Sequence, residues 1–234
     1  MKIALLGYGR MGKAIEKYAK QRAHEIVYKH DKNEVEGDLS LADVAINFSV
    51  PNAALENIKL ALKKQIPVVS GTTGWLEHYE EIVSFCNTQK SGFLYASNFS
   101  IGVNLFFKIN SIAAKLMKSQ NEDYHPSLEE IHHIHKLDAP SGTAITLAET
   151  VMEESDLTEW ELNGDSKDKL KIKSLREGEV PGTHIIKYTS SIDEITLKHE
   201  AFSRDGFALG AVIASEWLVG KEGIFSMKDV LNIS

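Results

Sequence analysis

The sequence predicts an α/β protein with an N-terminal doubly wound parallel sheet, followed by a second, α+β domain with a mixed sheet. Over about the first hundred residues, short apolar runs alternate with segments of helical periodicity, which is typical of a parallel sheet covered by helices. A glycine-rich turn follows the first apolar run. Beyond this region, three β-rich runs follow one another without intervening helices, which favours a mixed or antiparallel sheet.

The elements of the first half are predicted from their apolar patterns. The run at 2–6 is typical of a buried strand, and residues 10–22 carry apolar side chains at helical spacing. Pro51 suits the start of a helix, because a missing N–H costs nothing there. The predicted order is strand 2–6, helix 10–22, strand 25–29, strand 43–49, helix 52–64, strand 66–70, helix 75–88 and strand 92–96.

The second half has a different rhythm. The polar and acidic stretch 155–168 is predicted to be an exposed connection, and the last helix carries few charges, so we expect it to be deeply packed. The predicted order is helix 102–118, strand 128–135, helix 142–154, strands 169–175, 183–190 and 192–200, and helix 207–219.

Composition limits the classes of function. A chain of 234 residues with 43% hydrophobic residues can form one large domain or two modest ones. Its net charge of -7 argues against nucleic acid or an anionic membrane as the main partner. Cys86 is the only cysteine, and the sequence has neither a signal-peptide core nor an apolar run of about 18 residues. We expect a cytoplasmic protein without nucleic-acid or membrane partners.

A phosphate-binding turn is predicted near the N-terminus. Residues Gly7-Tyr8-Gly9-Arg10-Met11-Gly12 match G-x-G-x-x-G between a strand and a helix, where backbone N–H groups face a pyrophosphate. Asp31 follows Gly12 by nineteen residues and could accept hydrogen bonds from a ribose diol; the alternative is a surface turn. Lys29 and Lys32 could hold a 2′-phosphate, so NADH and NADPH both remain open.

A second glycine-containing turn, Gly71-Thr72-Thr73-Gly74, follows the fourth predicted strand. Ligands of open α/β sheets bind beyond the carboxyl ends of the strands. The two hydroxyls therefore suit a nicotinamide ribose or carboxamide. An ordinary turn with a helix cap explains the same residues equally well.

The most distinctive segment is 129–144, in which three histidines fall within four residues, next to a lysine. No H-E-x-x-H spacing is present and the one cysteine is distant, so we predict no metal site. A histidine can instead donate a proton near neutral pH, and Ser141-Gly142-Thr143 precede an apolar helix, where an anion can bind. These groups predict a pocket for a small carboxylate.

In an extended strand His132 and Lys136 would lie roughly 13 Å apart, so joint action of the two side chains on one substrate requires a bend near Leu137–Pro140.

The chain resembles the dihydrodipicolinate reductase family over nearly its whole length. Glu130 through Ala144 match E-x-H-H-x-x-K-x-D-x-P-S-G-T-A without a gap. Further matches are the glycine loop, Gly71-Thr72-Thr73, Ala96-Ser97-Asn98-Phe99-Ser100 and the ending His199-Glu200-Ala201 with Ser203-Arg204.

The resemblance implies an activity and a domain organisation. It implies reduction of 4-hydroxy-tetrahydrodipicolinate to tetrahydrodipicolinate by NADH or NADPH, in diaminopimelate and lysine synthesis. Hydride goes to the ring C4 and the adjacent carbon is protonated. A Rossmann domain is expected at 1–100, completed by C-terminal helices at about 204–234. A substrate-binding and oligomerisation domain at 101–203, which closes over the substrate and builds a homotetramer, is expected between them.

The resemblance also implies roles for individual residues. His132 is expected to be the general acid or base, and Lys136 a second proton donor that holds the anionic substrate. The residues expected to bind the substrate carboxylates are His133, Ser141, Gly142 and Thr143. The residues expected to bind the dinucleotide are Gly7, Tyr8, Gly9, Arg10, Met11, Gly12, Asp31, Lys32, Gly71, Thr72, Thr73, Ala96, Ser97, Asn98 and Phe99.

Six histidines that no motif includes are predicted to be surface or structural: His24, His30, His78, His125, His184 and His199. Two other functions compete with the reductase. A different Rossmann-type dehydrogenase, acting on an amino or semialdehyde acid, would keep the glycine loop but has no reason to carry the H-H-x-x-K run. In a non-catalytic dinucleotide sensor, His132 and Lys136 would be incidental.

Overall fold

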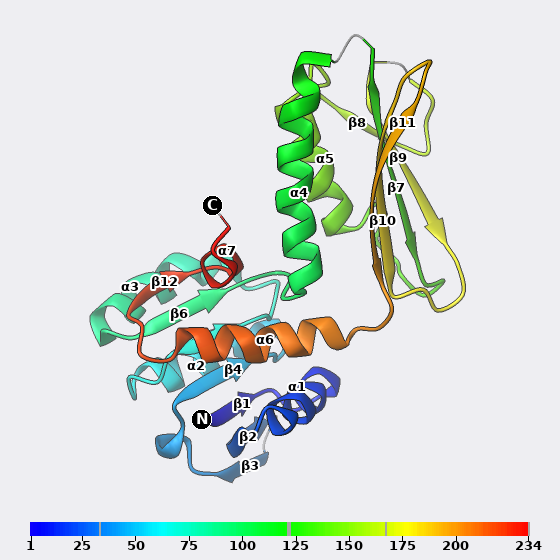
Figure 1. Cartoon of the computed structure of the whole chain (residues 1–234). Coiled ribbons are helices and arrows are strands. Elements are labelled where there is room, and N and C mark those ends of the chain that lie inside the picture. The colour runs from blue at the N-terminus through cyan, green and yellow to red at the C-terminus, as the bar shows by residue number, and fades with distance from the viewer. Residues whose placement is uncertain (33, 121–122, 167, 234) are drawn as a thin grey trace. The chain divides into compact units, whose positions relative to one another are not determined.

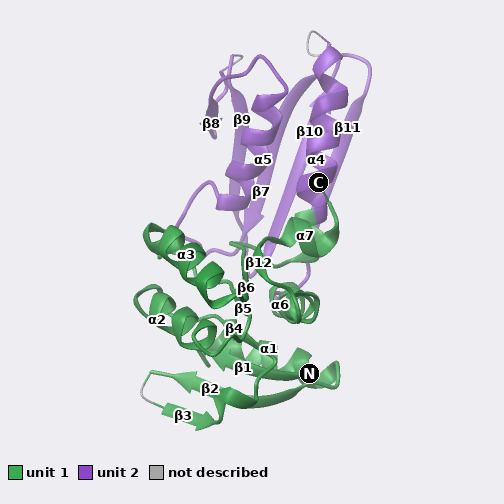
Figure 2. Ribbon diagram, turned by 90° about the vertical axis from the view of Figure 1, so that its left-hand side faces the viewer, with its two compact units in different colours: residues 1–104, 205–234 green, residues 105–204 purple. Residues whose placement is uncertain are grey.

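The computed structural model describes residues 1–32, 34–120, 123–166 and 168–233. The chain divides into two compact units (Figures 1 and 2). Unit 1 comprises residues 1–104 and 205–234, and unit 2 comprises residues 105–204. The C-terminal segment therefore belongs to the same unit as the N-terminal one.

Unit 1 is built around a seven-stranded sheet with the order β12-β6-β5-β4-β1-β2-β3 (Figure 1). All neighbouring strands are parallel except β2 and β3, which form an antiparallel hairpin. The strands are β1 (Lys2–Leu6), β2 (Glu25–Asp31), β3 (Glu34–Gly37), β4 (Val44–Asn47), β5 (Val68–Ser70), β6 (Gly92–Tyr95) and β12 (Gly223–Phe225).

Helices cover both faces of this sheet. Alternate residues of β1 point to opposite faces: Ile3 and Leu5 pack with α1 and α6, whereas Ala4 and Leu6 pack with α2 and α3. Burial on both faces explains why these strands are almost continuously apolar. The helices are α1 (Arg10–Gln21), α2 (Pro51–Leu62), α3 (Tyr79–Gln89), α6 (Asp205–Leu218) and α7 (Met227–Leu231), with short 3-10 helices at Leu39–Leu41 and Leu76–His78.

Unit 2 contains a mixed five-stranded sheet with the order β11-β10-β7-β9-β8. Strands β7, β8 and β9 run parallel, and β10 and β11 pair antiparallel. Helices α4 and α5 cover one face (Figure 1), over a core that includes Leu128, Leu147 and Ile186. The elements are α4 (Ile101–Met117), a 3-10 helix (Lys118–Gln120), β7 (His125–His132), α5 (Gly142–Glu153), β8 (Trp160–Leu162), β9 (Leu170–Arg176), β10 (Gly182–Thr189) and β11 (Glu194–Ala201).

The predicted fold class is confirmed, and the differences concern short elements. The sequence pattern does not predict β3, β8, β12 or α7. The expectation that 155–168 is only an exposed connection is wrong at β8, because Trp160 and Leu162 are half-buried and pack against the core of unit 2. Residue 167 of that stretch lies outside the described residues.

The longest helix that the structure describes is α4, with 17 residues. Neither α4 nor any other described helix combines the length and the apolar character needed to cross a membrane.

Candidate active site

The glycine-rich turn joins β1 to α1, as predicted. Gly7 has a φ of 99°, and a Cβ there would lie 2.2 Å from the carbonyl oxygen of Phe48, so only glycine fits. At Gly12, a Cβ would lie 2.4 Å from the carbonyl oxygen of Gly7. A Cβ on Gly9 would meet nothing within 4 Å. The space in front of the α1 N-terminus is therefore open, where backbone amides and the helix dipole favour a pyrophosphate.

Tyr8 of this turn is tied to α1 and β2 through a cluster of charges, here called the Glu16 cluster (Tyr8, Glu16, Lys20 and Lys29). The Tyr8 hydroxyl donates to the Glu16 carboxylate, and Lys29 Nζ lies 4.6 Å from the centre of the Tyr8 ring. Lys20 and Lys29 lie 2.8 and 3.3 Å from Glu16 Oε1. Burial raises the pKa of Glu16, but hydrogen bonds from Lys20, Tyr8 and Lys29 outweigh it and lower the pKa to about 2. Lys29 thus pairs with Glu16 and packs on Tyr8, so a 2′-phosphate would have to compete with Glu16 for its ammonium group.

The end of β2 lies beside the glycine loop, because the Gly7 N–H donates to the carbonyl of His30 at 2.8 Å. Asp31, the last residue of β2, is half-buried and pairs with Glu34 of β3. Lys32 follows in the left-handed conformation, with a φ of 50°, and its side chain is exposed. Asp31 therefore directly follows the residue whose carbonyl contacts the glycine loop, where an acceptor for a ribose diol is expected.

A cavity of about 210 Å³ lies between the glycine loop and the second turn of unit 1. Its lining residues are Met11, Phe48, Ser49, Pro51, Gly71, Thr72 and Thr73. The Thr72 hydroxyl is buried and accepts hydrogen bonds from the Ser49 N–H at 2.9 Å and the Asn47 side chain at 3.3 Å. This hydroxyl therefore holds the loop after β4 in place. Thr73 is exposed, so its hydroxyl can reach a ligand.

The segment after β6, Ala96–Phe99, is also predicted to contact the cofactor, and its side chains differ in burial. The Phe99 side chain is buried, and its ring lies 5.6 Å from the Phe48 ring. The Asn98 side chain accepts a hydrogen bond from the Ser100 N–H at 2.8 Å. Ser97 is exposed. A cofactor contact by Phe99 would therefore have to come from its main chain.

In unit 2, strand β7 ends at His132, so the prediction of a strand over 128–135 is wrong at its C-terminal end. The reason lies in its neighbours. The last pairs of β7 are Ile131 with Thr183 of β10, and His132 with Arg176 of β9. Beyond His132 neither neighbouring strand offers a partner, and the chain leaves the sheet.

The chain turns directly after β7 and bends again at residues 139 and 140, inside the predicted 137–140. The Lys136 N–H donates to the carbonyl of His133 at 3.1 Å and closes a turn there, ahead of the predicted 137–140. Arg176 fixes this turn by donating to the carbonyls of Lys136 at 3.2 Å and Asp138 at 2.6 Å. The Lys136 ammonium lies 2.7 Å from the Asp138 carboxylate and its side chain is 20% exposed. The turn therefore fixes the Lys136 ammonium in an ion pair with Asp138, and a ligand carboxylate would have to share that ammonium with Asp138.

The N-terminus of α5 follows this turn. Ser141 is the N-cap residue, and its hydroxyl accepts the Ala144 N–H at 3.2 Å. The Ser141 side chain is buried and its own N–H donates to Glu130. Gly142 is exposed and Thr143 half-buried, and amides of a first helical turn have no acceptor within the helix. Gly142 and Thr143 are therefore better placed than Ser141 to bind a carboxylate.

Glu130 is the buried centre of this region, with 0% exposure. Its carboxylate accepts hydrogen bonds from the Ser141 N–H at 3.0 and 3.1 Å, the Ser174 hydroxyl at 2.7 Å and the Arg176 guanidinium at 3.5 Å. Burial raises the pKa of Glu130, but the hydrogen bonds from Ser141 and Ser174 outweigh it, and the pKa is lowered overall. Glu130 is therefore a buried carboxylate that stays ionised.

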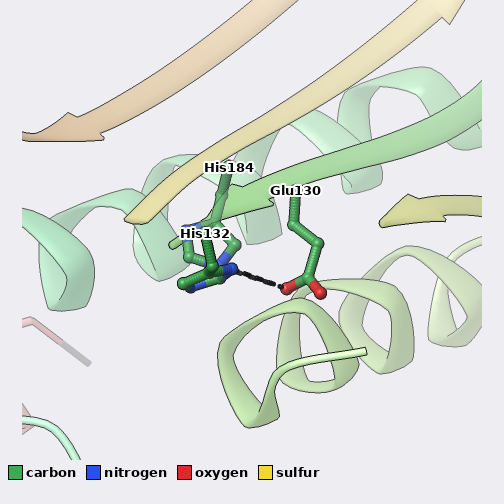
Figure 3. Close-up of side chains that lie close together, drawn as sticks. All are labelled: Glu130, His132 and His184. Atoms are coloured by element: carbon green, nitrogen blue, oxygen red, sulfur yellow. Dashed lines mark ion pairs between the residues drawn. The ribbon is translucent and has the colours of Figure 1, made fainter. Parts of the chain in front are cut away.

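His132 lies against Glu130 at the end of β7 (Figure 3). Its Nδ1 is 3.5 Å from Glu130 Oε2 and has no hydrogen-bond partner among the described residues. Burial lowers the pKa of His132, the Glu130 charge raises it and the Lys136 charge lowers it, with a lowered pKa as the result. The free protein thus keeps this imidazole largely neutral at pH 7, with a positive charge and a helix N-terminus nearby.

His184 lies beside these residues, and of the two expectations for it, surface or structural, the structure excludes the surface. It is 4% exposed, and its ring lies 5.1 Å from the His132 ring in an edge-to-face arrangement. The alternation of side chains along β10 could have predicted that His184 is buried. His184 lies on the same face of this strand as the buried Ile186 and Tyr188. The pairing of His184 with Glu130 cannot be predicted from local sequence.

His133 contacts a second cation. Its Nε2 lies 2.7 Å from the Arg204 guanidinium, and because arginine is always a donor, this nitrogen is the acceptor. Arg204 is exposed. Arg204 is therefore available to a carboxylate at the surface of unit 2, whereas Nε2 of His133 is occupied by Arg204 and its Nδ1 is buried.

Glu130, His132 and His184 offer ligand atoms that lie within 4.8 Å of one another. The Glu130 carboxylate, however, already accepts four hydrogen bonds, one of them from Arg176. A divalent cation would have to compete with that guanidinium. We assign no metal to these residues, and the predicted absence of a metal stays a prediction.

Two family models together match almost the whole chain. Residues 1–99 match the model described as "Dihydrodipicolinate reductase, N-terminus". Residues 102–231 match "Dihydrodipicolinate reductase, C-terminus". The chain belongs to the dihydrodipicolinate reductase family.

Relatives of full length agree with this family. The chain is 54% identical to a 4-hydroxy-tetrahydrodipicolinate reductase of Christiangramia forsetii, over 99% of this chain and 98% of the relative. It is 34% identical to one of Archaeoglobus fulgidus, over 99% and 100%. A solved dihydrodipicolinate reductase from Paenisporosarcina sp. has a TM-score of 0.81, with 22% identity over 98% of each chain, and supports the fold.

Membership in the dihydrodipicolinate reductase family confirms the predicted family and enzyme class. The chain is an NADH- or NADPH-dependent reductase of diaminopimelate and lysine synthesis. A dehydrogenase of another family and a non-catalytic sensor are no longer needed to explain the sequence. The roles of the individual site residues stay predictions, for which the geometry above supplies the physical basis.

Proposed function

We propose that unit 2 binds 4-hydroxy-tetrahydrodipicolinate through its carboxylates and protonates it from His132. The observation that carries this proposal is the turn after β7. It brings the Lys136 ammonium and the N-terminus of α5 into the neighbourhood of the buried His132–Glu130 pair. A proton donor beside an anion-binding helix end is what the reduction of a dianionic ring requires.

Two kinds of group would recognise the carboxylates. The amides of Gly142 and Thr143 supply hydrogen-bond donors at the positive end of α5. Lys136 supplies a compact charge, held in place through its own backbone by Arg176. Arg204, in contact with His133, adds a planar guanidinium that matches a carboxylate. Specificity for a dicarboxylate would follow from the separation of these donors.

The proton chemistry follows from charge. In the free protein the pKa of His132 is lowered overall. Burial is the largest cause; the Glu130 charge raises this pKa, and the Lys136 charge lowers it. A dianion bound beside Lys136, which in the free protein already pairs with Asp138, adds negative charge near His132, so the pKa of His132 rises on binding. His132 would then take up a proton, donate it to the substrate carbon and recover it from solvent.

Unit 1 would hold the dinucleotide. The open space in front of Gly9 and the cavity beside Met11 fit a pyrophosphate and the group that follows it. Asp31 would accept hydrogen bonds from a ribose diol. When bound, NADH or NADPH supplies the hydride. The role of the chain itself is to bind and orient it.

Binding of dipicolinate tests the substrate assignment without turnover. The Paenisporosarcina relative is described as bound to dipicolinate, which makes this dicarboxylate a suitable probe. We expect Lys136→Gln to weaken dipicolinate binding at least tenfold while NADH binding is unchanged. The matched control is Lys187→Gln, a lysine of unit 2 that pairs with Glu194 on β11; it should leave both affinities intact. Equal dipicolinate affinity in Lys136→Gln and the unmodified protein would remove Lys136 from the site.

We also propose that the protein is a homotetramer that works in the cytoplasm. In the part of unit 2 that the structure describes, helices cover one face of the sheet (Figure 1), and a second copy could cover the other. The single cysteine, Cys86, is buried and free, which suits a reducing compartment. Light scattering on the purified protein tests the assembly, and a monomeric mass at micromolar concentration would reject it.

A further inference from the structure

We propose that Glu130 and His184 are positioning residues for His132. In this proposal the Glu130 carboxylate selects the tautomer of His132 and makes its ring more basic. His184 is an uncharged neighbour that leaves His132 to take the proton. The inference rests on the proposed role of His132 as proton donor, and the experiment below separates the two.

The three side chains meet because of strand geometry. Glu130 and His132 are two residues apart on β7 and therefore share a face. His184 is the direct partner of Glu130 on the adjacent β10. Their side chains are 0%, 9% and 6% exposed, in that order. Figure 3 shows them converging, with the Glu130 carboxylate beside the His132 ring. A buried carboxylate thus faces two buried imidazoles.

Glu130 cannot easily turn away from this position. Its carboxylate is held by the Ser141 N–H, the Ser174 hydroxyl and the Arg176 guanidinium. Glu130 Oε2 lies 3.5 Å from Nδ1 of His132, so a small rotation of the ring brings Nδ1–H into a hydrogen bond with it. A carboxylate that accepts Nδ1–H fixes the tautomer and stabilises the protonated ring.

The other nitrogen of His132 is then the donor. A Cβ on Gly182 would lie 3.2 Å from Nε2, so glycine at this position of β10 keeps that edge of the ring uncovered. In the step proposed here, the Nε2–H bond breaks as a C–H bond forms on the carbon next to the hydride acceptor. The electron pair stays on Nε2. The ring ends neutral, with Nδ1–H directed at Glu130, and regains its proton from solvent.

His184 is suited to remain uncharged. Burial, and after it the charge on a protonated His132, lower the pKa of His184 to about 4. Its Nε2 lies 3.2 Å from the Ser141 hydroxyl, while its ring meets that of His132 edge to face. A neutral His184 therefore fills the far side of His132 without adding a second positive charge. It also connects the proton donor to the cap of α5.

Among the described residues, the charged and titratable groups that act most strongly on the two rings come from β7, β9, β11 and the turn after β7. Glu130 faces His132 from β7, Arg176 faces it from β9, and Lys136 and Asp138 face it from the turn. His199 faces His184 from β11. Of these groups, only Glu130 and Asp138 raise the pKa of His132, and Glu130 is the buried one.

Two variants at neighbouring positions of β7 test whether Glu130 acts on His132. Glu130→Gln removes the buried charge, and Glu129→Gln removes an identical charge from the opposite face of β7, where it pairs with Lys173 at 3.1 Å. The measurements are kcat, KM and their pH dependence in the reductase assay, with NADH affinity as a check on unit 1. An opposite charge within about 4–6 Å shifts a pKa by about one unit or more.

For Glu130→Gln we expect kcat to fall at least tenfold, with a smaller change in KM. The decline of kcat/KM with rising pH should begin about one unit lower, because His132 has lost the charge that favours its protonated form. Glu129→Gln should leave kcat, KM and the pH profile unchanged. If the pH profile of Glu130→Gln coincides with that of the unmodified enzyme, Glu130 does not act on His132.

Two further variants keep the test decisive if Glu130→Gln fails to fold. Glu130→Asp retains the charge, so kcat should fall while the pH profile stays closer to that of the unmodified enzyme. His184→Phe retains an aromatic edge, and we expect a loss of kcat below about tenfold without a shift of the profile. A loss as large as that of His132→Gln would make His184 the proton donor and overturn the proposal. Full activity in His132→Gln would instead overturn the proposed function.

Discussion

Replacement of Glu16 by glutamine should weaken unit 1 by an amount that depends on pH. The pKa of Glu16 is lowered from 4.5 to about 2 by the hydrogen bonds from Lys20, Tyr8 and Lys29, which outweigh burial. A difference of about 2.5 units corresponds to about 3.4 kcal/mol in favour of the ionised form. The amide keeps part of the hydrogen bonding, so we expect Glu16→Gln to cost about 2 kcal/mol at pH 7.

The sign of the pH dependence is fixed by the direction of this shift. Because the pKa of Glu16 is lower in the folded than in the unfolded chain, the stabilisation is complete above about pH 4.5 and is lost as the pH falls towards 2. The difference between the unmodified protein and Glu16→Gln should therefore shrink to less than about 1 kcal/mol by pH 3.

Urea unfolding can report on unit 1 alone. In a Trp160→Phe background the two remaining tryptophans, Trp75 and Trp217, both lie in unit 1. The matched control is Glu36→Gln, which also loses a pairing with Lys29, at 3.7 Å, but whose side chain is 79% exposed; it should change the free energy of unfolding by less than about 0.5 kcal/mol. Equal losses in the two variants, or a loss for Glu16→Gln that does not vary with pH, would refute this role of the Glu16 cluster.

Two further predictions concern His184 and Asp31. The pKa of His184 is lowered to about 4 by burial and by His132, so protonation favours the unfolded chain, and the stability of unit 2 should fall by up to about 3 kcal/mol between pH 6.5 and pH 4. His184→Phe should flatten this part of the urea-unfolding profile, and an unchanged slope would count against a buried neutral His184. Asp31→Ala should weaken NADH more than NADPH in a fluorescence titration, because the ribose diol loses its acceptor; equal weakening would reject that contact.

Sequence patterns predicted the layout of unit 1 because its strands are buried on both faces and therefore remain apolar throughout. The glycine loop was predictable for a local reason, since the left-handed Gly7 and the tight contact at Gly12 both demand glycine. Strand β3 escaped prediction because its residues are all exposed and mostly polar. Strand β12 escaped because its three residues are only half-buried and form no extended apolar run. Strand β8 escaped because it lies in a polar stretch.

The candidate site of unit 2 was predictable only in part. The motif around His132 indicates which side chains matter, but not which of them face a ligand. Ser141 and Thr72 prove to be engaged inside the protein. The early end of β7 depends on where β9 and β10 stop. The meeting of Glu130 with His184 depends on a pairing between residues 54 positions apart in the chain.

The central claim is that His132 supplies the proton for the reduction. Single-turnover reduction of freshly generated 4-hydroxy-tetrahydrodipicolinate, with saturating NADH, measures this step directly in the unmodified enzyme and in His132→Gln. A positioned general acid contributes roughly a hundredfold to ten-thousandfold in rate, so we predict a loss in that range, with NADH and dipicolinate affinities changed by less than about threefold. Product formation in His132→Gln at the rate of the unmodified enzyme would contradict the claim.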